Sequence, residues 1–439
     1  MVEAETSGKM STGLARVAER ARRDPGKMLA LAHHIDQEAL ERAFHRIRKD
    51  AAVGVDGVTK EEYGRDLAGN LADLHGRLKA MRYRHQPIRR VHIPKGKGKT
   101  RPIGVSAIED KIVQGALREL LEVIYEQDFL DCSYGFRPGR SAHDALKALN
   151  RSIRHGEASW ILEADIASFF DNVDRPTLKE MLQERIDDKS LMRLVGKCLR
   201  VGVLDGAEFS TPEAGTAQGS ILSPLLGNIY LHHAVDLWYQ REVRPRLKGR
   251  SCLVRYADDL LFGFELREDA ERVMAVLEKR LSRYGLGLSP DKTRLLDFRM
   301  PPKDRQSGKG PGSFDFLGFT HYWRRSRRGW WHPAWKTRSK SLRKAIISLQ
   351  SWCKGHRHLT IPEQHAALTR RIQGHFNYFG VNGNQRSLAM ILNKVKRSWF
   401  KWLRRRSQRT RMTWERFNRI LRELSLPRVR VYTNLWAAP

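Results

Sequence analysis

Residues 252–264 read CLVRYADDLLFGF, and this stretch decides the fold. Two apolar segments flank a short Ala257-Asp258-Asp259 turn, which is the pattern of a hairpin with largely buried strands. An isolated Asp-Asp pair at a hairpin tip is usually only a turn, because aspartate tolerates turn geometry and bonds its own backbone. Here the pair lies between buried strands, where clustered carboxylates are costly unless a cation accompanies them. The stretch therefore predicts a hairpin whose tip holds a cation.

A third carboxylate ends another apolar stretch, WILEADI at residues 160–166, where the acid is Asp165. The following FFDNVDRPTLKEML opens a helix, with Pro176 near its start. If the two strands are neighbours in one antiparallel sheet, Asp165, Asp258 and Asp259 converge on one edge. Such a cluster suits Mg²⁺, which prefers oxygen ligands and substrate phosphates. Two such ions ~3.5–4 Å apart can activate a hydroxyl and stabilise a leaving pyrophosphate.

Elements elsewhere in the chain indicate an α+β fold. The first 80 residues have the spacing of amphipathic helices, and residues 88–105 predict two extended segments joined by a Lys/Gly turn, a basic hairpin. Beyond about residue 336 helical spacing takes over. Two apolar stripes there predict helix cores: Leu342, Ile346, Leu349 and Cys353, and Leu388, Leu392, Val395 and Trp399. Strands and helices mix without strict alternation, so we expect an antiparallel sheet with packed helices.

Composition excludes several classes of protein. The 439 residues allow two to four domains, 41% are hydrophobic, and no apolar run approaches the ~18–20 residues that span a bilayer. The N-terminal stretch lacks the pattern of a leader, so we expect a cytoplasmic protein of bacterial type with no membrane partner. The four cysteines are far apart without C-x-x-C pairing, which argues against a zinc ribbon or a disulfide framework.

The charge balance points to a polyanionic partner. The chain has 81 Lys and Arg against 49 Asp and Glu, a net charge of +32. A membrane-surface protein would concentrate this charge on one amphipathic helix, whereas here basic residues recur along the whole length. We therefore expect the partner to be nucleic acid.

With these motifs in place, the sequence resembles the reverse transcriptases encoded by bacterial group II introns, also called maturases. The likeness runs in the family's order over most of residues 53–320. It comprises DGVT (56–59), IPKGKGKTRPIGV (93–105), SYGFRPGRSAHDAL (133–146), ADIASFFDNVD (164–174), GTAQGSILSPLLGNIYL (215–231), RYADDLLFG (255–263), GLGLSPDKT (285–293) and FDFLGF (314–319).

The resemblance implies a right-hand polymerase. Residues 1–155 are expected to form an N-terminal extension and the fingers, with part of the palm interleaved. Residues 156–325 are expected to form the palm with the catalytic site, and residues 326–439 an all-helical thumb and maturase module that binds RNA and DNA.

It also implies site residues. Asp165, Asp258 and Asp259 match the metal-binding catalytic triad for two Mg²⁺ ions, and the carbonyl of Ile166 is expected to join the metal and nucleotide site. Phe170 matches the ring that excludes a 2′-hydroxyl and so selects dNTP over rNTP, although an aromatic there could also be core, as we expect for Phe169. Further nucleotide contacts are expected at Lys95, Arg101 and Gln218.

Nucleic-acid contacts are expected at Arg137 in GFRPGR, at Lys292 in SPDKT, and at Arg404, Arg405 and Arg406. The implied partners are the parent intron RNA, an RNA template with a DNA primer, target DNA and dNTPs. The oligomeric state is not indicated. No Cys-paired H-N-H endonuclease motif is present, so the likeness is to the endonuclease-lacking group II-C class.

Three functions fit these features. The first is RNA-directed DNA synthesis by target-primed reverse transcription of the intron, combined with binding of the intron RNA to assist its splicing and mobility. The second keeps the polymerase but places it in DNA repair or phage defence, as a reverse transcriptase adopted by its host. The third is an RNA-binding splicing maturase without polymerase activity, which would not require the three carboxylates.

Overall fold

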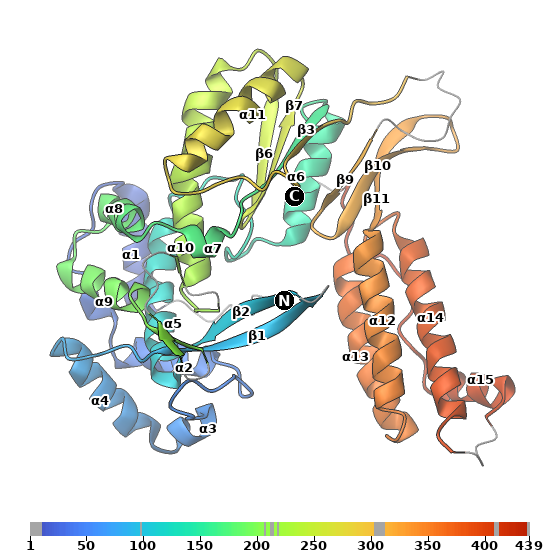
Figure 1. Cartoon of the computed structure of the whole chain (residues 1–439), viewed down its shortest axis with the longest axis horizontal. Coiled ribbons are helices and arrows are strands. Elements are labelled where there is room, and N and C mark those ends of the chain that lie inside the picture. The colour runs from blue at the N-terminus through green and yellow to red at the C-terminus, as the bar shows by residue number, and fades with distance from the viewer. Residues whose placement is uncertain are drawn as a thin grey trace.

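The structure is a computed structural model, and it describes residues 11–96, 99–205, 208–210, 215–216, 219–302, 312–407 and 412–436. An N-terminal group of helices, a small sheet, a central sheet with its helices and a C-terminal group of helices make up these ranges (Figure 1). None of the helices within them is both long enough and apolar enough to cross a membrane.

Helices α1 and α2 pack on one long buried helix, α5, and α4 packs on α2. Their bounds are α1 Thr12–Arg23, α2 Gln37–Arg46, α3 Lys60–Tyr63, α4 Leu67–Lys79 and α5 Ile108–Tyr125. The side-chain oxygens of Ser11, Asp36 and Thr59 accept backbone N–H bonds at the starts of α1, α2 and α3, which stabilises these helix ends. Leu117 and Leu121 of α5 are fully buried in the shared core. The expected helical start of the chain is confirmed.

A basic hairpin extends from this group. It belongs to a sheet of order β2-β1-β4-β5, with β1 Ile88–Gly96, β2 Lys99–Val105, β4 Val203–Asp205 and β5 Glu208–Ser210. Strands β1 and β2 are antiparallel, with Ile93 opposite Arg101. The predicted hairpin at 88–105 is therefore confirmed, and it runs toward the C-terminal helices (Figure 1).

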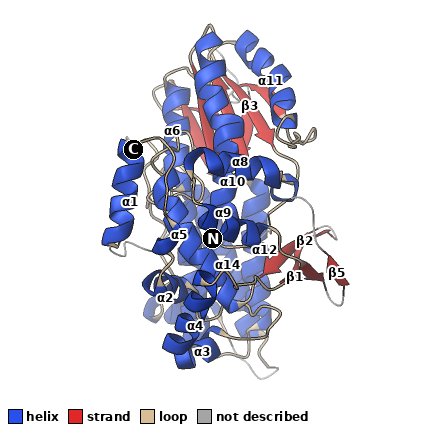
Figure 2. Cartoon of the chain, turned by 90° about the vertical axis from the view of Figure 1, so that its left-hand side faces the viewer, coloured by secondary structure: helices blue, strands red, loops and turns tan. Residues whose placement is uncertain are grey.

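The central sheet has the order β6-β7-β3-β8, and all its pairings are antiparallel. Its strands are β3 Trp160–Asp165, β6 Ser251–Tyr256, β7 Asp259–Phe264 and β8 Arg294–Asp297. The helices in and around this part are α6 Ala142–Arg154, α7 Phe169–Asn172, α8 Arg175–Arg185, α9 Lys189–Leu199, α10 Ser223–Leu231 and α11 Arg267–Ser282. Figure 2 shows helices covering the sheet.

The central sheet is buried on both faces. Leu162 and Phe262 pack into the same core as α11, while Ile161 and Leu261 pack into a second core with α6. Because successive side chains point to opposite faces, a sheet covered on both sides requires nearly continuous apolar strands. This explains the WILEAD and LLFGF runs, and the predicted α+β class with an antiparallel sheet and packed helices is confirmed.

A third sheet links the central part to the C-terminal helices. Its order is β11-β10-β9, with β9 Ser313–Phe316, β10 Phe319–Arg325 and β11 Trp331–Thr337, and it is followed by α12 Ser339–Gly355, α13 Ile361–Phe379, α14 Gln385–Arg404 and α15 Trp414–Glu423. The expectation that residues 326–439 are all helical is wrong for β11. Its burial alternates along the strand and it pairs with β10, which gives the strand a buried face that a helix would lose. The two predicted apolar stripes do lie in the helical core, where Leu388 and Trp399 are fully buried.

Candidate active site

Strands β3 and β7 place Asp165 directly opposite Asp259. The backbone carbonyl of Asp165 accepts a bond from Ser289 N–H at 2.8 Å, on the side of the strand away from β7. Asp165 and Asp259 are therefore a non-hydrogen-bonded pair, in which the Cα atoms approach to about 4.5 Å and the side chains are closer than in the alternate pairs. Two carboxylates far apart in the sequence are thus neighbours.

The two carboxylates lie on the same face of the sheet. Alternation along the strands places Asp165 on the face of Ile161 and Asp259 on the face of Leu261, and both of these apolar residues belong to the second core. That core is also formed by the β9–β10 region, so the acidic end of this face borders the sheet that leads to the C-terminal helices.

Asp258 lies in the two-residue turn between β6 and β7. Its neighbour Ala257 has a φ of 56°, a conformation that is disfavoured for residues with a Cβ. Ala257 is the first of the two turn residues, and a turn in which only the first residue has positive φ is a type II′ hairpin turn. Burial raises the pKa of Asp258, the charge of Asp165 raises it further, and the nearby cations of Arg101 and Lys292 lower it. A cation that approaches the turn would therefore stabilise the ionised form of the Asp258 carboxyl.

The pKa of Asp259 is raised to about 6. The main cause is desolvation by the surrounding protein, followed by the negative charges of Asp258 and Asp165. The side chain still has an exposed part, so a solute can reach it. Mutual repulsion of three carboxylates of this kind is the situation in which a divalent cation binds favourably.

Lys292 partly neutralises this cluster. Its Nζ lies 2.6 Å from Asp165 Oδ2, at a position that is open to solvent. Among the described residues, no three carboxylate, imidazole or thiol groups are placed so as to close around a metal ion. The carboxylate oxygens of the cluster are of the kind that hard divalent cations prefer, and Oδ2 of Asp165 is paired with the Lys292 ammonium group.

The carbonyl of Ile166 points to the side of β3 on which β7 lies. Ala167 N–H donates to Gly287 O at 2.9 Å, and Ser289 N–H donates to Asp165 O. These two bonds flank Ile166, so the N–H and carbonyl groups of Ile166 itself point away from residues 287–289 and toward β7. Ile166 itself is buried, at 3% exposure. Its backbone oxygen is thus oriented toward the side on which Asp258 and Asp259 lie.

A buried ion pair lies next to the turn that carries Asp258. Arg255, just before the turn, is fully buried and its Nη2 lies 2.5 Å from Oδ2 of Asp236, which is also fully buried. The same guanidinium donates through Nη1 to Asn228 Oδ1 at 2.9 Å and to the carbonyl of Ala257 at 3.2 Å. Our sequence reasoning missed this network, although an arginine inside an apolar strand signals a buried partner.

Phe170 lies in α7, directly after the strand that carries Asp165. Its ring is half-buried and meets the ring of Phe169 edge to face, with centroids 5.0 Å apart, whereas Phe169 is only 3% exposed. Gly227 of α10 leaves room for both rings, since a Cβ there would lie 3.0 Å from Phe169 Cε1 and 3.2 Å from Phe170 Cε1. Phe169 is therefore core, as expected, and Phe170 is held with part of its ring uncovered.

The three expected nucleotide contacts outside the palm are only partly described. Arg101 is exposed on β2, and it is close enough to lower the pKa of Asp258. Lys95 lies in β1 at the irregularity between Pro94 and Gly96, and its side chain is outside the described part. Gln218 also lies outside the described residues.

Arg137 does not fit the expectation of a nucleic-acid contact. Its guanidinium is 5% exposed and turned inward, where it donates to the Glu126 carboxylate and to the carbonyls of Leu130 and Ser133 at 2.8 and 2.9 Å. It also lies over the ring of Phe129. Arg137 instead holds the 133–140 loop in place, because burying a guanidinium is favourable only when its donors are paired.

The arginines at the end of α14 differ from one another. Arg404 and Arg405 are exposed, and Arg405 lies over the ring of Trp402. Arg406, by contrast, donates from Nε to the carbonyl of Arg357 at 2.7 Å and from its other end to that of Leu359. Its half-buried guanidinium joins the end of α14 to the segment between α12 and α13, so part of it is already engaged within the protein.

Two residues from the C-terminal half approach the carboxylates, and no sequence motif predicted either of them. The charge of Arg338, at the start of α12, lowers the pKa of Asp259, and Arg338 Nε lies 2.9 Å from Asp315 Oδ2. Tyr378 of α13 has its pKa raised by burial and by the charge of Asp259, and its hydroxyl donates to Leu317 O at 2.9 Å.

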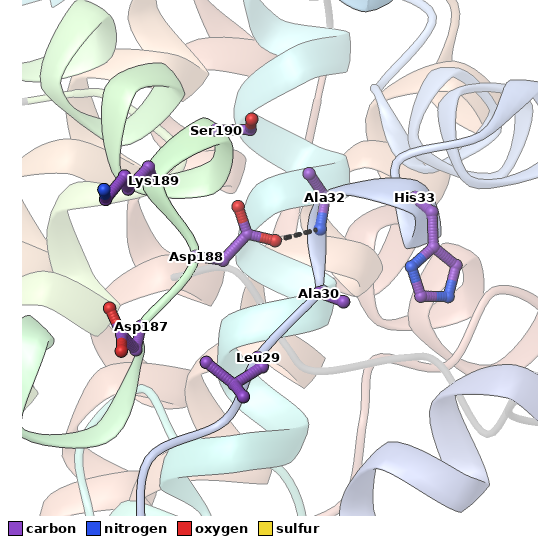
Figure 3. A pocket seen from close by; sticks show the side chains of 8 residues that line it. All are labelled: Leu29, Ala30, Ala32, His33, Asp187, Asp188, Lys189 and Ser190. Carbon is purple, nitrogen blue, oxygen red and sulfur yellow. Dashed lines mark hydrogen bonds between the residues drawn. The ribbon is translucent and has the colours of Figure 1, made fainter.

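A hollow elsewhere on the molecule has a structural role. It is lined by Leu29, Ala30, Ala32, His33, Asp187, Asp188, Lys189 and Ser190 (Figure 3). The Asp188 carboxylate accepts bonds from the backbone N–H groups of Leu31 at 2.6 Å and Ala32 at 2.8 Å. This carboxylate is committed to joining two segments, so the hollow adds no candidate chemistry.

Comparison with known proteins agrees with this geometry. A family model described as reverse transcriptase (RNA-dependent DNA polymerase) matches residues 93–321. The chain is 36% identical over 277 residues to Protein YkfC of Escherichia coli (strain K12), covering 55% of this chain and 71% of that protein. It is 46% identical over 214 residues to the group II intron-encoded protein LtrA of Lactococcus lactis subsp. cremoris, covering 46% of this chain and 35% of LtrA.

A more distant relative is nuclear intron maturase 4, mitochondrial, of Arabidopsis thaliana, with 29% identity over 140 residues, 32% of this chain and 17% of that protein. The chain thus aligns with only about a third of LtrA's length. The family match covers more than half of the chain and contains Asp165, Asp258 and Asp259. This protein therefore belongs to the reverse transcriptase family, is a right-hand RNA-dependent DNA polymerase, and is similar to proteins encoded by group II introns.

Proposed function

We propose that this protein copies the RNA of a group II intron into DNA at Asp165, Asp258 and Asp259, and that it binds the same RNA to assist splicing and mobility. The proposal rests chiefly on the direct pairing of Asp165 with Asp259 next to the turn that holds Asp258. In this proposal residues 1–155 serve as N-terminal extension and fingers, 156–325 as palm and 326–439 as thumb and maturase module.

Two Mg²⁺ ions would be held by the three carboxylates and the Ile166 carbonyl. When bound, such a pair lowers the pKa of a primer 3′-hydroxyl and neutralises charge on a leaving pyrophosphate. The protein's own part is to supply oxygen ligands whose repulsion favours a cation, since the pKa values of Asp258 and Asp259 are both raised. Lys292 neutralises Asp165 until the metal takes its place.

The incoming nucleotide would lie between the palm and the basic hairpin. Arg101 carries a positive charge near Asp258, and a guanidinium can form two parallel bonds to a phosphate. Lys95 and Gln218 are proposed to complete the triphosphate and base contacts. The half-buried ring of Phe170, fixed by Phe169 and Gly227, would lie beneath the sugar and exclude a 2′-hydroxyl.

The nucleic-acid partners follow from charge and from the relatives. A net charge of +32 suits a long polyanion, and LtrA and nuclear intron maturase 4 are named for group II introns or intron maturation. Exposed cations of the C-terminal helices, including Arg404 and Arg405, are proposed to contact RNA or DNA backbone. We further propose that the protein acts in the bacterial cytoplasm, near the nucleoid.

Primer extension tests the polymerase half of the proposal. Purified protein is given a DNA primer on an RNA template with Mg²⁺ and either dNTPs or rNTPs, and we expect extension with dNTPs only. Asp258→Asn should abolish extension while leaving RNA affinity nearly intact, because it removes a metal ligand and no phosphate contact. Undiminished extension by this variant would refute the assigned site.

The intron half is tested separately, by the RNA that surrounds the coding region. A group II intron must fold around the gene that encodes its protein, and we expect tight binding of that flanking RNA and faster splicing of it. If the flanking sequence forms no intron, the host-adopted polymerase of repair or defence is the remaining reading. Normal splicing assistance together with no extension by the wild-type protein would favour the maturase without polymerase activity.

A further inference from the structure

Backbone strain is concentrated around the candidate site. Six residues other than glycine have positive φ within the described ranges: Ala30, Met81, Phe136, Ser168, Ala257 and Leu317. Ser168 begins α7 just after Asp165, Ala257 is in the catalytic turn, and Leu317 accepts the hydroxyl of Tyr378. Positive φ in a residue with a bulky side chain is rare and persists only where the surroundings impose it. Phe136, with φ of 59°, is the aromatic member of this set.

The residue before Phe136 is pressed against the catalytic turn. A Cβ on Gly135 would lie 2.4 Å from Ala257 N and 3.0 Å from the carbonyl carbon of Tyr256, so only glycine fits there. The side-chain amide of Asn228 donates to Gly135 O at 2.7 Å. This places the backbone of Phe136 one residue from the turn that carries Asp258.

The residue after Phe136 is anchored on the opposite side. Arg137 is buried and donates to Glu126 and to two backbone carbonyls of its own loop. With Gly135 and Arg137 both fixed inward, Phe136 is held between two immobile neighbours. Its ring is directed outward and is 52% exposed.

This exposure is not the ordinary exposure of a loop aromatic. Single apolar residues on a surface are common and need no explanation. Phe136, however, retains a strained backbone that asparagine or glycine would adopt more readily, and its ring takes part in none of the ring–ring or cation–ring contacts found in the described part of the chain. The fold thus presents an uncovered ring next to the turn that carries Asp258.

We propose that Phe136 is a stacking platform for the template–primer, receiving the face of a base or sugar next to the catalytic turn. This inference deepens the proposed function and rests on it. Bases stack on aromatic rings independently of sequence, because every base has a π face, which suits an enzyme that must copy any template. The rigid anchoring by Gly135 and Arg137 lets the ring order a nucleotide without itself losing much freedom on binding.

The test separates the ring from the backbone strain. Phe136→Asn removes the ring but favours positive φ, so its thermal stability should equal or exceed that of the wild type, whereas its Kd for a DNA primer on an RNA template should rise about tenfold. Phe136→Gly serves as a second variant of the same kind. Phe136→Trp keeps a stacking face and should retain affinity within about threefold.

Fluorescent 2-aminopurine, placed in turn at the primer terminus and at the adjacent template position, identifies the strand that stacks. We expect quenching on binding wild-type protein at one of the two positions, and its loss with Phe136→Asn. Equal affinity of wild type and Phe136→Asn, or equal losses in the Asn and Trp variants, would overturn the proposal. These measurements need no turnover, so their failure is distinguishable from failure of the polymerase assignment, which is read from extension by the wild type.

Discussion

Lys292 Nζ lies 2.6 Å from Oδ2 of Asp165, so the third carboxylate of the site is held by a side chain of the same protein. If a metal ion binds through this oxygen, as we propose, it displaces the ammonium group of Lys292. The residues involved in that exchange can be varied one at a time.

Replacing Lys292 should strengthen metal binding in the absence of nucleic acid. Lys292→Gln removes both the competing ion pair and a nearby positive charge, so we expect Mn²⁺, used as a probe for Mg²⁺, to bind severalfold more tightly at pH 8. Lys292→Arg keeps the charge and serves as the matched control. Calorimetric titration gives both constants, and identical affinities of wild type and Lys292→Gln would show that the pair does not compete.

Metal affinity should also fall as the solution becomes more acidic. The pKa of Asp259 is raised to about 6, so this carboxyl is ionised at pH 8 and becomes protonated as pH falls through about 6. A protonated carboxyl is a poor metal ligand, so Mn²⁺ affinity is expected to decline in that range. In Lys292→Gln the decline should begin at higher pH, because the charge of Lys292 lowers the pKa of Asp259. A pH-independent affinity between 5.5 and 8 would contradict this.

The buried Arg255–Asp236 pair should be required for stability and for the shape of the turn. Arg255→Met leaves an unpaired buried carboxylate and is expected to cost about 3–5 kcal/mol of unfolding free energy, measured in urea. The double variant Arg255→Met with Asp236→Leu should recover much of this loss. Both variants lack the bond to Ala257 O, so both should lose primer extension. Full extension by the double variant would show that the pair does not position the turn.

Phe170 and Phe169 offer a matched pair for sugar selection. Phe170→Ala should raise rNTP incorporation relative to dNTP by about tenfold or more, since pocket shape is what excludes the extra hydroxyl. Phe169→Ala should instead lower stability by about 3–5 kcal/mol, because it empties a core position. Single-nucleotide incorporation and urea unfolding distinguish them. Unchanged discrimination in Phe170→Ala would make Phe170 a second core residue.

The arginines at the end of α14 should differ in function, with Arg404 and Arg405 contributing to RNA binding and Arg406 to stability. Replacing Arg404 and Arg405 with glutamine is expected to reduce the slope of log Kd against log salt for RNA by about 0.7–0.9 for each lost phosphate contact. Arg406→Gln should leave the slope unchanged but lower stability by about 1–3 kcal/mol, since it removes charged hydrogen bonds to two carbonyls. A slope unaffected by the double replacement would remove both residues from the interface.

The central hairpin and the strand that ends at Asp165 were predictable because their signals are local, whereas the pairing of Asp165 with Asp259 was expected only if the two strands were neighbours. Apolar runs before and after Asp258 indicate buried strands, and the acid at the end of WILEAD repeats the pattern. Strand β11 was not among the predicted elements, and its Pro333 is unusual inside a strand. In the structure β11 is an edge strand, where proline is tolerated.

The roles of individual arginines were less accessible. In a chain with so many basic residues, the sequence does not distinguish Arg137 and Arg406 from arginines that contact phosphate. Only the structure shows that Arg137 donates to the Glu126 carboxylate and that Arg406 donates to a backbone carbonyl. Arg338 and Tyr378 approach Asp259 from helices that follow it by many residues. Long-range contacts of this kind leave no spacing pattern in a sequence.

The pairing of β3 with β7 also has a consequence for synthesis of the protein on a ribosome. Asp165 emerges well before its partner Asp259, and Lys292 emerges later still. Until β7 has left the exit tunnel, the growing chain has one acid on a strand that lacks its neighbour, and no nucleotide chemistry is available to it. The three carboxylates and Lys292 can therefore come together only after about two thirds of the chain has been synthesised.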